Sequence, residues 1–389
     1  MTTTPECFMQ AELALAAYAV LARGVPDPQR LRDADMSESQ AVRFSASWTV
    51  IDQFTDPSSG VSATIFQKGS QRYLAIRGTE PAANDILVDG ILALGFAAKL
   101  NPQFDALKTQ IDKWLADSAM LKDQTFTVSG HSLGGYLAAA VKQQYGAKVT
   151  DAYLFNAPGS GGLVGNIVDL LSGVFGQSIP GANGIWNIKA SEGASFSTGL
   201  GGQPSAAIPI QIEEAPGAGF GNHSIVPLTD ALAVQALYSK LGPNLSQDQL
   251  NALVDASGNT MNRTLESALD ALRVILLGSD ATPTPWAADA SSRDVFYTNL
   301  YNLKNDVHYT QLVGNSTINP ITEIKKATDM ASAAQDDIAV RYALKALNPF
   351  ALVGANYSAF NVGGALDATK GVRDEIVFQR LAHAVTQPN

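Results

Sequence analysis

Length, composition and charge already narrow the class of protein. The chain has 389 residues, of which 46% are hydrophobic and 16% charged, so it can bury a sizeable core and is not a largely disordered protein. Its formal net charge of −10 argues against nucleic acid or an anionic membrane surface as a partner. The single cysteine, Cys7, cannot form a disulfide within the chain, and no Cys/His cluster indicates a metal, so we expect no cofactor.

The first residues favour a helix over a targeting segment. No positively charged residue opens the chain, and Glu6 and Glu12 interrupt its apolar residues, so residues 6–22 are predicted to form an amphipathic helix rather than a signal peptide. The longest apolar run, around residues 91–98, is far below the roughly 20 residues that a membrane span needs. We therefore expect no transmembrane segment. The sequence leaves two cellular locations open: the cytoplasm, or the outside of the cell after secretion by a leaderless route.

From residue 41 to residue 157, extended and helical patterns alternate. Extended segments are predicted at 41–54, 61–66, 72–77, 125–128 and 152–157. Apolar residues at helical spacing predict helices at 82–96, 102–121 and 135–141. Strands that alternate with helices form mostly parallel sheets with helices on both faces, and we expect this architecture here. Ligands then bind at the carboxyl ends of the strands.

The remainder of the chain contains an apolar segment, two more strands and a run of helices. Residues 160–184 combine glycines with an apolar stretch, which fits either a mobile lid over an apolar site or an ordinary buried connecting helix. Strands are predicted at 185–190 and 206–212. Residues 243–347 show helical spacing and include a capping box at Ser246-x-x-Gln249, so this region is predicted to be mainly helical.

One motif predicts a catalytic nucleophile. Gly130-His131-Ser132-Leu133-Gly134 fills the frame G-x-S-x-G, which occurs by chance in chains rich in glycine and serine. Here, however, a β-branched strand ends just before the frame and a helix begins just after it, as a nucleophile elbow requires. The elbow exposes the serine hydroxyl on a strained turn, and its glycines leave room where a Cβ would clash. Ser132 is therefore the predicted nucleophile.

A serine hydroxyl needs a histidine to take its proton, and the chain has only four histidines. His131 lies inside the elbow, where its ring cannot turn back onto Ser132. His308 lies in a polar segment of the helical region, and His383 lies near the C-terminus. His223 follows the last predicted core strand in a glycine-rich loop, so we predict that it is the base.

The acid of a Ser-acid-His set should lie between Ser132 and His223. The carboxylates there are Asp151, Asp169, Glu192, Glu213 and Glu214. Glu192 directly follows the strand at 185–190, on the same edge of the sheet as Ser132, and is the preferred acid. Asp151 precedes its strand and so faces the opposite end of the sheet.

An oxyanion hole needs two preorganised N–H donors. The first is predicted to be the amide of Leu133, directly after the nucleophile. The second should come from a loop that follows an earlier strand, and the amide of Thr79 is placed for this role. Gly78 before it permits close approach of the backbone, although a simple turn at the strand end would explain the same residues.

Several motifs together resemble a known family. The sequence is similar to the class 3 lipase-like branch of the α/β-hydrolases, and more closely to the lipase-like N-terminal regions of large bacterial secreted proteins that end in haemolysin-type calcium-binding repeats. The resemblance rests on Arg77-Gly78-Thr79, on the GHSLGG segment, on Phe155-Asn-Ala-Pro158 and on Asn222-His223-Ser224-Ile225.

This resemblance implies an α/β-hydrolase fold with esterase or lipase activity, and it places Ser132, His223 and the amides of Thr79 and Leu133 on the family's functional positions. The family's acid is usually aspartate, so Glu192 departs from the pattern. The glycine- and aspartate-rich repeats are absent, so bound calcium does not carry over. The expected domains are a catalytic core over 1–242 with a lid at 160–184, a helical accessory region over 243–347 and a C-terminal segment over 348–389.

The predicted function is hydrolysis of carboxylic esters through an acyl-enzyme on Ser132. The apolar stretch at 160–184 favours small-molecule esters with an apolar acyl group, polyesters included, over peptides. An acyltransferase or a phospholipase on the same fold, or a non-catalytic binding module, are the alternatives.

Overall fold

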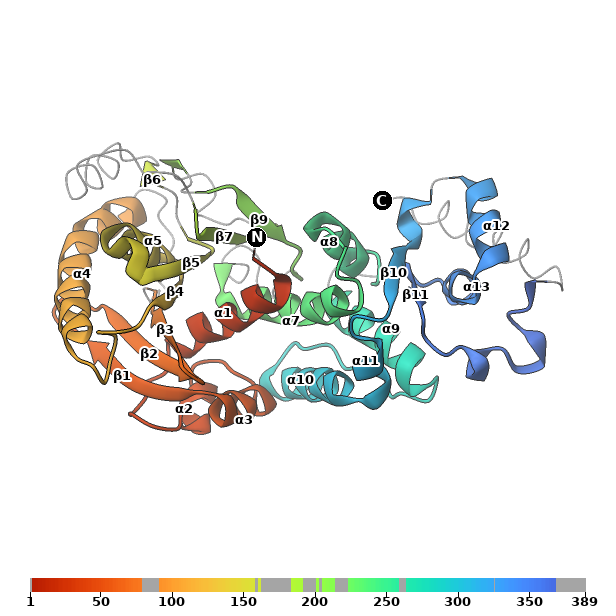
Figure 1. Ribbon diagram of the computed structural model, residues 1–389, viewed down its shortest axis with the longest axis horizontal. Coiled ribbons are helices and arrows are strands. Elements are labelled where there is room, and N and C mark those ends of the chain that lie inside the picture. Colours follow the sequence, from red (N-terminus) through yellow and green to blue (C-terminus); the bar gives the residue numbers. More distant parts are fainter. Residues whose placement is uncertain are drawn as a thin grey trace. The chain divides into compact units, whose positions relative to one another are not determined.

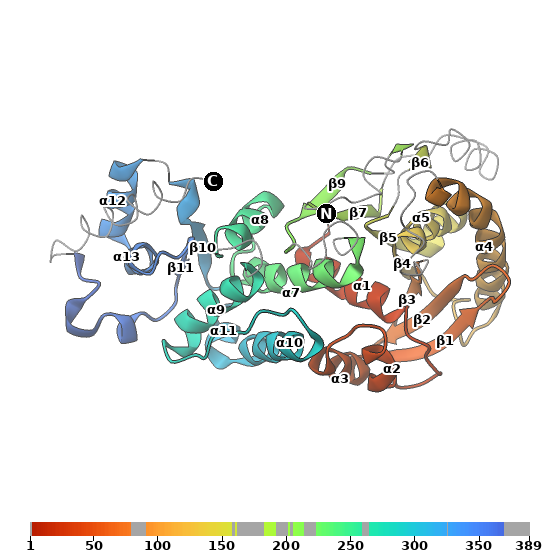
Figure 2. The same cartoon turned by 180° about the vertical axis from the view of Figure 1, so that it is seen from behind.

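The computed structural model (Figures 1 and 2) describes residues 2–78, 91–157, 160–161, 183–191, 201–202, 205–213, 223–258, 264–324 and 326–368. The chain divides into two compact units, and the division falls between Asp230 and Ala231, inside helix α7 (Ile225–Leu241).

A seven-stranded sheet in the order β1-β2-β3-β4-β5-β7-β9 forms the centre of the first unit (Figure 1). Its strands are β1 (Thr49–Thr55), β2 (Ser62–Lys68), β3 (Gln71–Ile76), β4 (Phe126–His131), β5 (Val149–Phe155), β7 (Ile185–Ala190) and β9 (Ala207–Ile210). The pairs β1/β2 and β2/β3 are antiparallel, and every pair from β3 to β9 is parallel. The expected mostly parallel sheet is confirmed. A separate short pair, β6 (Ser160–Gly161) and β8 (Gly201–Gly202), is antiparallel.

The helices of this unit before α7 include two that the sequence pattern did not predict, over Pro28–Arg32 and Glu38–Ser47. The described helices before α7 are α1 (Thr4–Ala16), α2 (Pro28–Arg32), α3 (Glu38–Ser47), α4 (Ile91–Ala116), α5 (Leu133–Tyr145) and the 3-10 turn η1 (Gly146–Lys148). The prediction of an extended segment over 41–54 is wrong in its first half, because α3 occupies it. The Ser37 hydroxyl caps α3 by accepting the N–H of Gln40 at 3.1 Å, and the strand begins only at Thr49.

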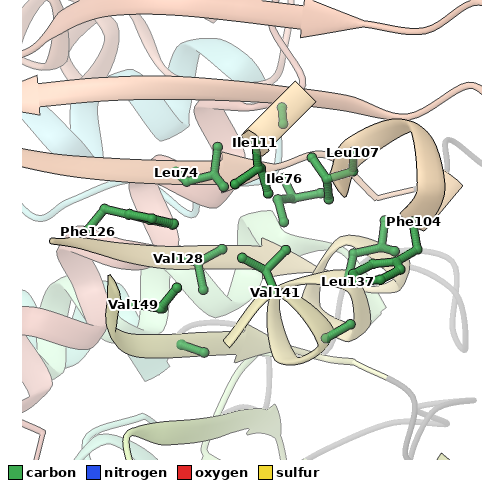
Figure 3. Close-up of a cluster of buried hydrophobic side chains, with 14 of the residues drawn as sticks. Leu74, Ile76, Phe104, Leu107, Ile111, Phe126, Val128, Leu137, Val141 and Val149 are labelled. Carbon is green, nitrogen blue, oxygen red and sulfur yellow. The ribbon is translucent and has the colours of Figure 1, made fainter. Parts of the chain in front are cut away.

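Helices α4 and α5 pack on one face of the sheet and bury its aliphatic side chains (Figure 3). Leu74 of β3 and Val128 of β4 lie in this core beside Ile111 of α4 and Val141 of α5, and all four are fully buried. Each such side chain contributes about 1.5–3 kcal/mol through burial. Since side chains alternate along a strand, His131 of β4 faces away from this core, toward the end of α1.

The second unit is mainly helical, as expected. Its helices are the end of α7, α8 (Gln247–Asp255), α9 (Thr264–Leu277), α10 (Ala290–Asn305), α11 (Val307–Leu312), α12 (Ala327–Asp336) and α13 (Ile338–Lys345), with 3-10 turns η3 (Ile321–Glu323), η4 (Ser358–Phe360) and η5 (Val362–Gly364). The capping box predicted at Ser246 is present at the start of α8. Two strands that the pattern did not predict, β10 (Thr317–Pro320) and β11 (Phe350–Val353), pair antiparallel across 29 intervening residues, from 321 to 349.

Within the described ranges, no helix is both long and apolar enough to cross a bilayer. In those same ranges, no three His, Cys, Asp or Glu side chains gather closely enough to hold a metal ion.

Candidate active site

Ser132 stands at the turn between β4 and α5 in a conformation that side chains rarely adopt. Its backbone angles are φ 54° and ψ −125°. A non-glycine residue in such a region costs on the order of 1–3 kcal/mol and persists only where the surroundings enforce it. Here the Ser132 N–H donates to the carbonyl of Phe155 at the end of β5, at 2.9 Å, and the helix begins at the next residue.

The glycines on either side of Ser132 let three backbone segments meet at the turn. A Cβ on Gly130 would lie 2.2 Å from the carbonyl oxygen of Gly134, and a Cβ on Gly134 would lie 2.3 Å from that of Ile76 at the end of β3. Neither distance is tolerable, and both obstacles are backbone atoms. The frame recognised in the sequence is therefore a steric requirement of β3, β4 and α5 packing together.

The structure brings His223 to Ser132 from 91 positions away in the chain. The His223 Nε2 atom lies 3.0 Å from the Ser132 Oγ atom, within hydrogen-bond distance. Burial lowers the pKa of His223 to about 4, so the ring is neutral at ordinary pH and can accept a proton. Accepting the serine proton on Nε2 requires the other ring nitrogen, Nδ1, to carry the hydrogen.

In a Ser-His-acid set, the acid accepts a hydrogen bond from this second ring nitrogen, Nδ1. The Nδ1 atom of His223 is buried and has no hydrogen-bond partner among the described residues. A buried N–H without a partner is unfavourable by about 1–3 kcal/mol, and in a Ser-His-acid set a carboxylate occupies this place.

Of the five carboxylates between Ser132 and His223, the structure describes two, Asp151 and Glu213. Glu192, Asp169 and Glu214 lie outside the described residues. Asp151 lies near the start of β5, where its Oδ1 atom accepts the Trp186 indole N–H at 2.9 Å, and therefore lies at the end of the strand opposite Ser132. Glu213 follows β9.

The predicted oxyanion donors are likewise only partly described. Leu133 is the first residue of α5, so its amide is one of the donors that an α-helix leaves without an intrahelical partner. Thr79 lies outside the described residues, but its neighbour Gly78 lies close to the elbow. A Cβ on Gly78 would lie 3.3 Å from the Ser132 Cβ and 2.5 Å from the carbonyl oxygen of His131. The end of β3 therefore runs directly alongside the nucleophile.

The other histidines lie elsewhere or play a different part. His308 of α11 is exposed and pairs with Asp306 at 3.0 Å within the second unit. His383 lies outside the described residues, as does most of the proposed lid at 160–184. Neither printed partner of the His131 ring is Ser132: its Nδ1 atom lies 2.8 Å from the Tyr18 hydroxyl, and its Nε2 atom lies 2.7 Å from the backbone carbonyl oxygen of His223.

Two further residues of the site were not singled out from the sequence as functional. Asn156, just after β5, is fully buried at φ 46° and donates to the same His223 carbonyl at 3.1 Å. Tyr18, shortly after α1, has its hydroxyl 2.8 Å from the Nδ1 atom of His131. A polar residue that directly follows a buried parallel strand could have drawn attention to Asn156. Nothing in the sequence pattern connects Tyr18 with a histidine 113 positions later.

The fold and the elbow together define a class. A serine on a strained strand-turn-helix, at the carboxyl end of a central strand in a mostly parallel, helix-covered sheet, is the arrangement of the α/β-hydrolase fold. The predicted fold class is confirmed.

Comparison with known proteins gives matches among solved structures only. No family model matches the sequence, and no curated protein does. The chain is similar to Lip2 lipase from Yarrowia lipolytica, with 21% identity over 56% of this chain and 82% of that one and a TM-score of 0.36. It is also similar to lipase II from Rhizopus niveus (17% identity, 57% and 84% covered, TM-score 0.30) and to a triacylglycerol lipase from Penicillium expansum (13% identity, 54% and 79% covered, TM-score 0.30). Likeness at this level transfers neither an activity nor site residues to this chain.

Proposed function

We propose that this protein is a serine-dependent carboxylic-ester hydrolase that works through an acyl-enzyme on Ser132. The observation that carries the proposal is the 3.0 Å approach of the His223 Nε2 atom to the Ser132 Oγ atom, at a serine held in strained elbow geometry. Strain that the surroundings enforce at a nucleophile, with a neutral base in reach, is the arrangement that acyl transfer needs.

The reaction follows from these groups. His223 Nε2 takes the hydroxyl proton as Ser132 Oγ forms a bond to the ester carbonyl carbon, and the carbonyl oxygen becomes an oxyanion. The amides of Leu133 and Thr79 are the proposed donors to that oxyanion, and Glu192 is the proposed partner of His223 Nδ1. The imidazolium then gives its proton to the leaving alkoxide as the C–O bond breaks. Water, deprotonated by His223, attacks the acyl carbon, and Ser132 Oγ leaves with the proton restored.

The substrate is proposed to be a small ester with an apolar acyl group. The apolar composition of residues 160–184, which directly precede β7, supports this choice over a peptide. The resemblance to the lipase-like regions of repeat-bearing secreted proteins supports the same class, and polyesters belong to it chemically.

The decisive experiment separates the role of the Ser132 hydroxyl from the strain at Ser132. Hydrolysis of p-nitrophenyl esters of graded acyl length is measured on wild type, Ser132→Ala and Ser132→Gly. Both variants should lose turnover by roughly 1,000-fold or more, because the nucleophile is gone. Only Ser132→Gly should raise the free energy of unfolding, by about 1 kcal/mol, because glycine adopts φ 54° without strain whereas alanine does not.

The matched control is Ser129→Ala. Ser129 lies on β4, three residues before Ser132, and its buried hydroxyl has no hydrogen-bond partner among the described residues, so this variant should keep wild-type turnover. The acyl length of highest turnover in the wild type distinguishes an esterase from a lipase, and product analysis with added alcohol identifies acyl transfer. Wild-type protein that neither hydrolyses any ester nor reacts with a fluorophosphonate would contradict the proposal and favour a binding module.

A further inference from the structure

The backbone carbonyl of His223 is held by two side chains from the sheet. The His131 Nε2 atom lies 2.7 Å from this oxygen, and the Asn156 amide nitrogen lies 3.1 Å from it. His131 is the last residue of β4 and Asn156 directly follows β5, the neighbouring strand. The histidine loop is thereby attached to the sheet edge that also carries Ser132.

The geometry determines where the hydrogens lie. A carbonyl oxygen only accepts hydrogen bonds, so His131 Nε2 must carry a hydrogen and donate it. In a neutral ring the Nδ1 atom of His131 is then an acceptor, and the Tyr18 hydroxyl, 2.8 Å away, donates to it. Burial lowers the pKa of His131 to about 3, which keeps this ring neutral at ordinary pH. Tyr18, His131 and the His223 carbonyl therefore form a directed chain of hydrogen bonds.

Asn156 extends the same arrangement to the next strand. Its side-chain oxygen accepts the backbone N–H of Ala190, the last residue of β7, at 3.0 Å. Its buried position at φ 46° is a strained one for a residue with a side chain, although asparagine tolerates it better than most. One side chain thus ties the strand that leads toward Glu192 to the loop that bears His223.

We propose that His131, with Tyr18 behind it and Asn156 beside it, is a positioning residue that fixes the backbone of His223 so that its imidazole stays in reach of the Ser132 hydroxyl. The inference rests on the proposed ester hydrolysis, because it concerns the base of that reaction. The ring of His223 has no described hydrogen-bond partner at Nδ1; within the described residues it contacts Ser132 through Nε2 and packs against the His131 ring, with centroids 5.1 Å apart. A hydrogen bond to the carbonyl of the same residue restricts its backbone torsions and hence the direction of its Cα–Cβ bond.

The test compares two replacements of His131. His131→Leu fills similar space without a donor, and His131→Gln restores an N–H at about the reach of Nε2. For His131→Leu we expect kcat to fall by up to about 100-fold, the loss that a displacement of about 1 Å at a reacting group can cause, with KM nearly unchanged. His131→Gln should recover most of kcat. The rate of covalent labelling of Ser132 by a fluorophosphonate should follow the same order.

A second variant, Tyr18→Phe, tests the proposal even if His131→Leu does not fold. Tyr18→Phe removes the hydroxyl that donates to His131 Nδ1 and should lower kcat by roughly 3- to 10-fold, the effect of losing one hydrogen bond of about 1 kcal/mol. Its control is Tyr145→Phe, which removes a comparable hydroxyl that bonds the Asp112 carboxylate at 2.8 Å in α4, and this variant should keep wild-type kcat.

The outcomes are distinguishable. Wild-type turnover together with unchanged kcat in His131→Leu and Tyr18→Phe would overturn the positioning role and leave the hydrolase proposal intact. A loss of kcat that His131→Gln does not recover, and that is matched by a lower unfolding temperature, would assign His131 a merely structural role. Wild-type protein without turnover or labelling would overturn both proposals.

Discussion

Two polar clusters among the described residues, one in each unit, are built on opposite principles. In the second unit, Asp270 and Arg273 of α9 surround Thr284 of the proline-rich segment at 281–287. The Thr284 N–H and hydroxyl both donate to the Asp270 carboxylate at 2.6 Å, and Arg273 donates to the Thr284 hydroxyl at 3.0 Å and to the carbonyl of Thr282 at 2.9 Å. Opposite charges meet, and the cluster attaches a loop to a helix.

The cluster at the elbow has neither charge pairing nor relaxed geometry. His131 is buried and His223 is half-buried, burial lowers the pKa of both rings so that they are neutral, and Ser132 and Asn156 both have positive φ. One ring nitrogen, His223 Nδ1, is buried without a partner among the described residues. Paired charges with ordinary backbone indicate a stabilising cluster, whereas neutral bases, strain and an unpaired atom indicate a reactive one. The difference suggests three experiments.

The largest effect should come from the missing partner of His223. Glu192→Ala should lower kcat by about 100- to 10,000-fold, because the imidazole would lose the carboxylate proposed to orient it and to stabilise its protonated form. The loss should be smaller than in Ser132→Ala, which removes the nucleophile itself. The measurement is kcat on the best p-nitrophenyl ester. Full activity in Glu192→Ala would place the acid elsewhere, and Glu213 after β9 would be tested next.

The second cluster should affect stability but not turnover. Thr284→Ala removes a fully buried hydroxyl that bonds both Asp270 and Arg273, and should lower the free energy of unfolding by about 1–3 kcal/mol. Thr284→Ser keeps the hydroxyl and should lose less. Urea unfolding measures stability, and ester turnover is expected to match wild type in both variants. A selective loss of kcat in Thr284→Ala would break the distinction between the clusters.

The smallest effect concerns acid pH. An unfolded histidine binds a proton near pH 6.5, whereas burial lowers the pKa of folded His223 to about 4 and that of His131 to about 3. Below pH 6.5 the unfolded chain therefore binds protons that the folded one does not, so stability should decline as the pH falls toward 4. Activity should persist until His223 itself is protonated, with the acid limb of kcat/KM near pH 4.

Urea unfolding at pH 7, 6 and 5 checks the stability part of this prediction, and a pH profile of kcat/KM that extends below pH 4 checks the activity part. An acid limb near pH 6.5 would show that the effect of burial on the pKa of His223 is offset in the working enzyme, by solvent or by the proposed carboxylate at Nδ1. Stability that does not change between pH 7 and pH 5 would contradict the burial of both rings.

The elbow and the class of sheet could be predicted from the sequence because both depend on residues that are close together in the chain. The elbow has a required residue at nearly every position, because a Cβ on Gly130 or Gly134 would meet backbone atoms, and this demand is visible in the chain as a spacing. The alternation of strands and helices predicted the parallel sheet for the same reason, since side-chain periodicity reflects which face is buried. Segment 41–54 was misassigned because the cap at Ser37 competes with weak strand propensity, and local patterns resolve such competition poorly.

By itself, then, the sequence determined the strand and helix that hold Ser132 and the class of sheet, and it predicted Ser132 as the nucleophile and His223, among four histidines, as its base. Only the tertiary structure decided that Tyr18, His131 and Asn156 meet around the His223 carbonyl. The physical reason is how far apart along the chain the interacting residues lie. A turn is governed by contacts within a few residues, which leave a spacing in the chain, whereas a hydrogen bond between residues about 70 to 110 positions apart depends on strand order and register, which no local pattern records.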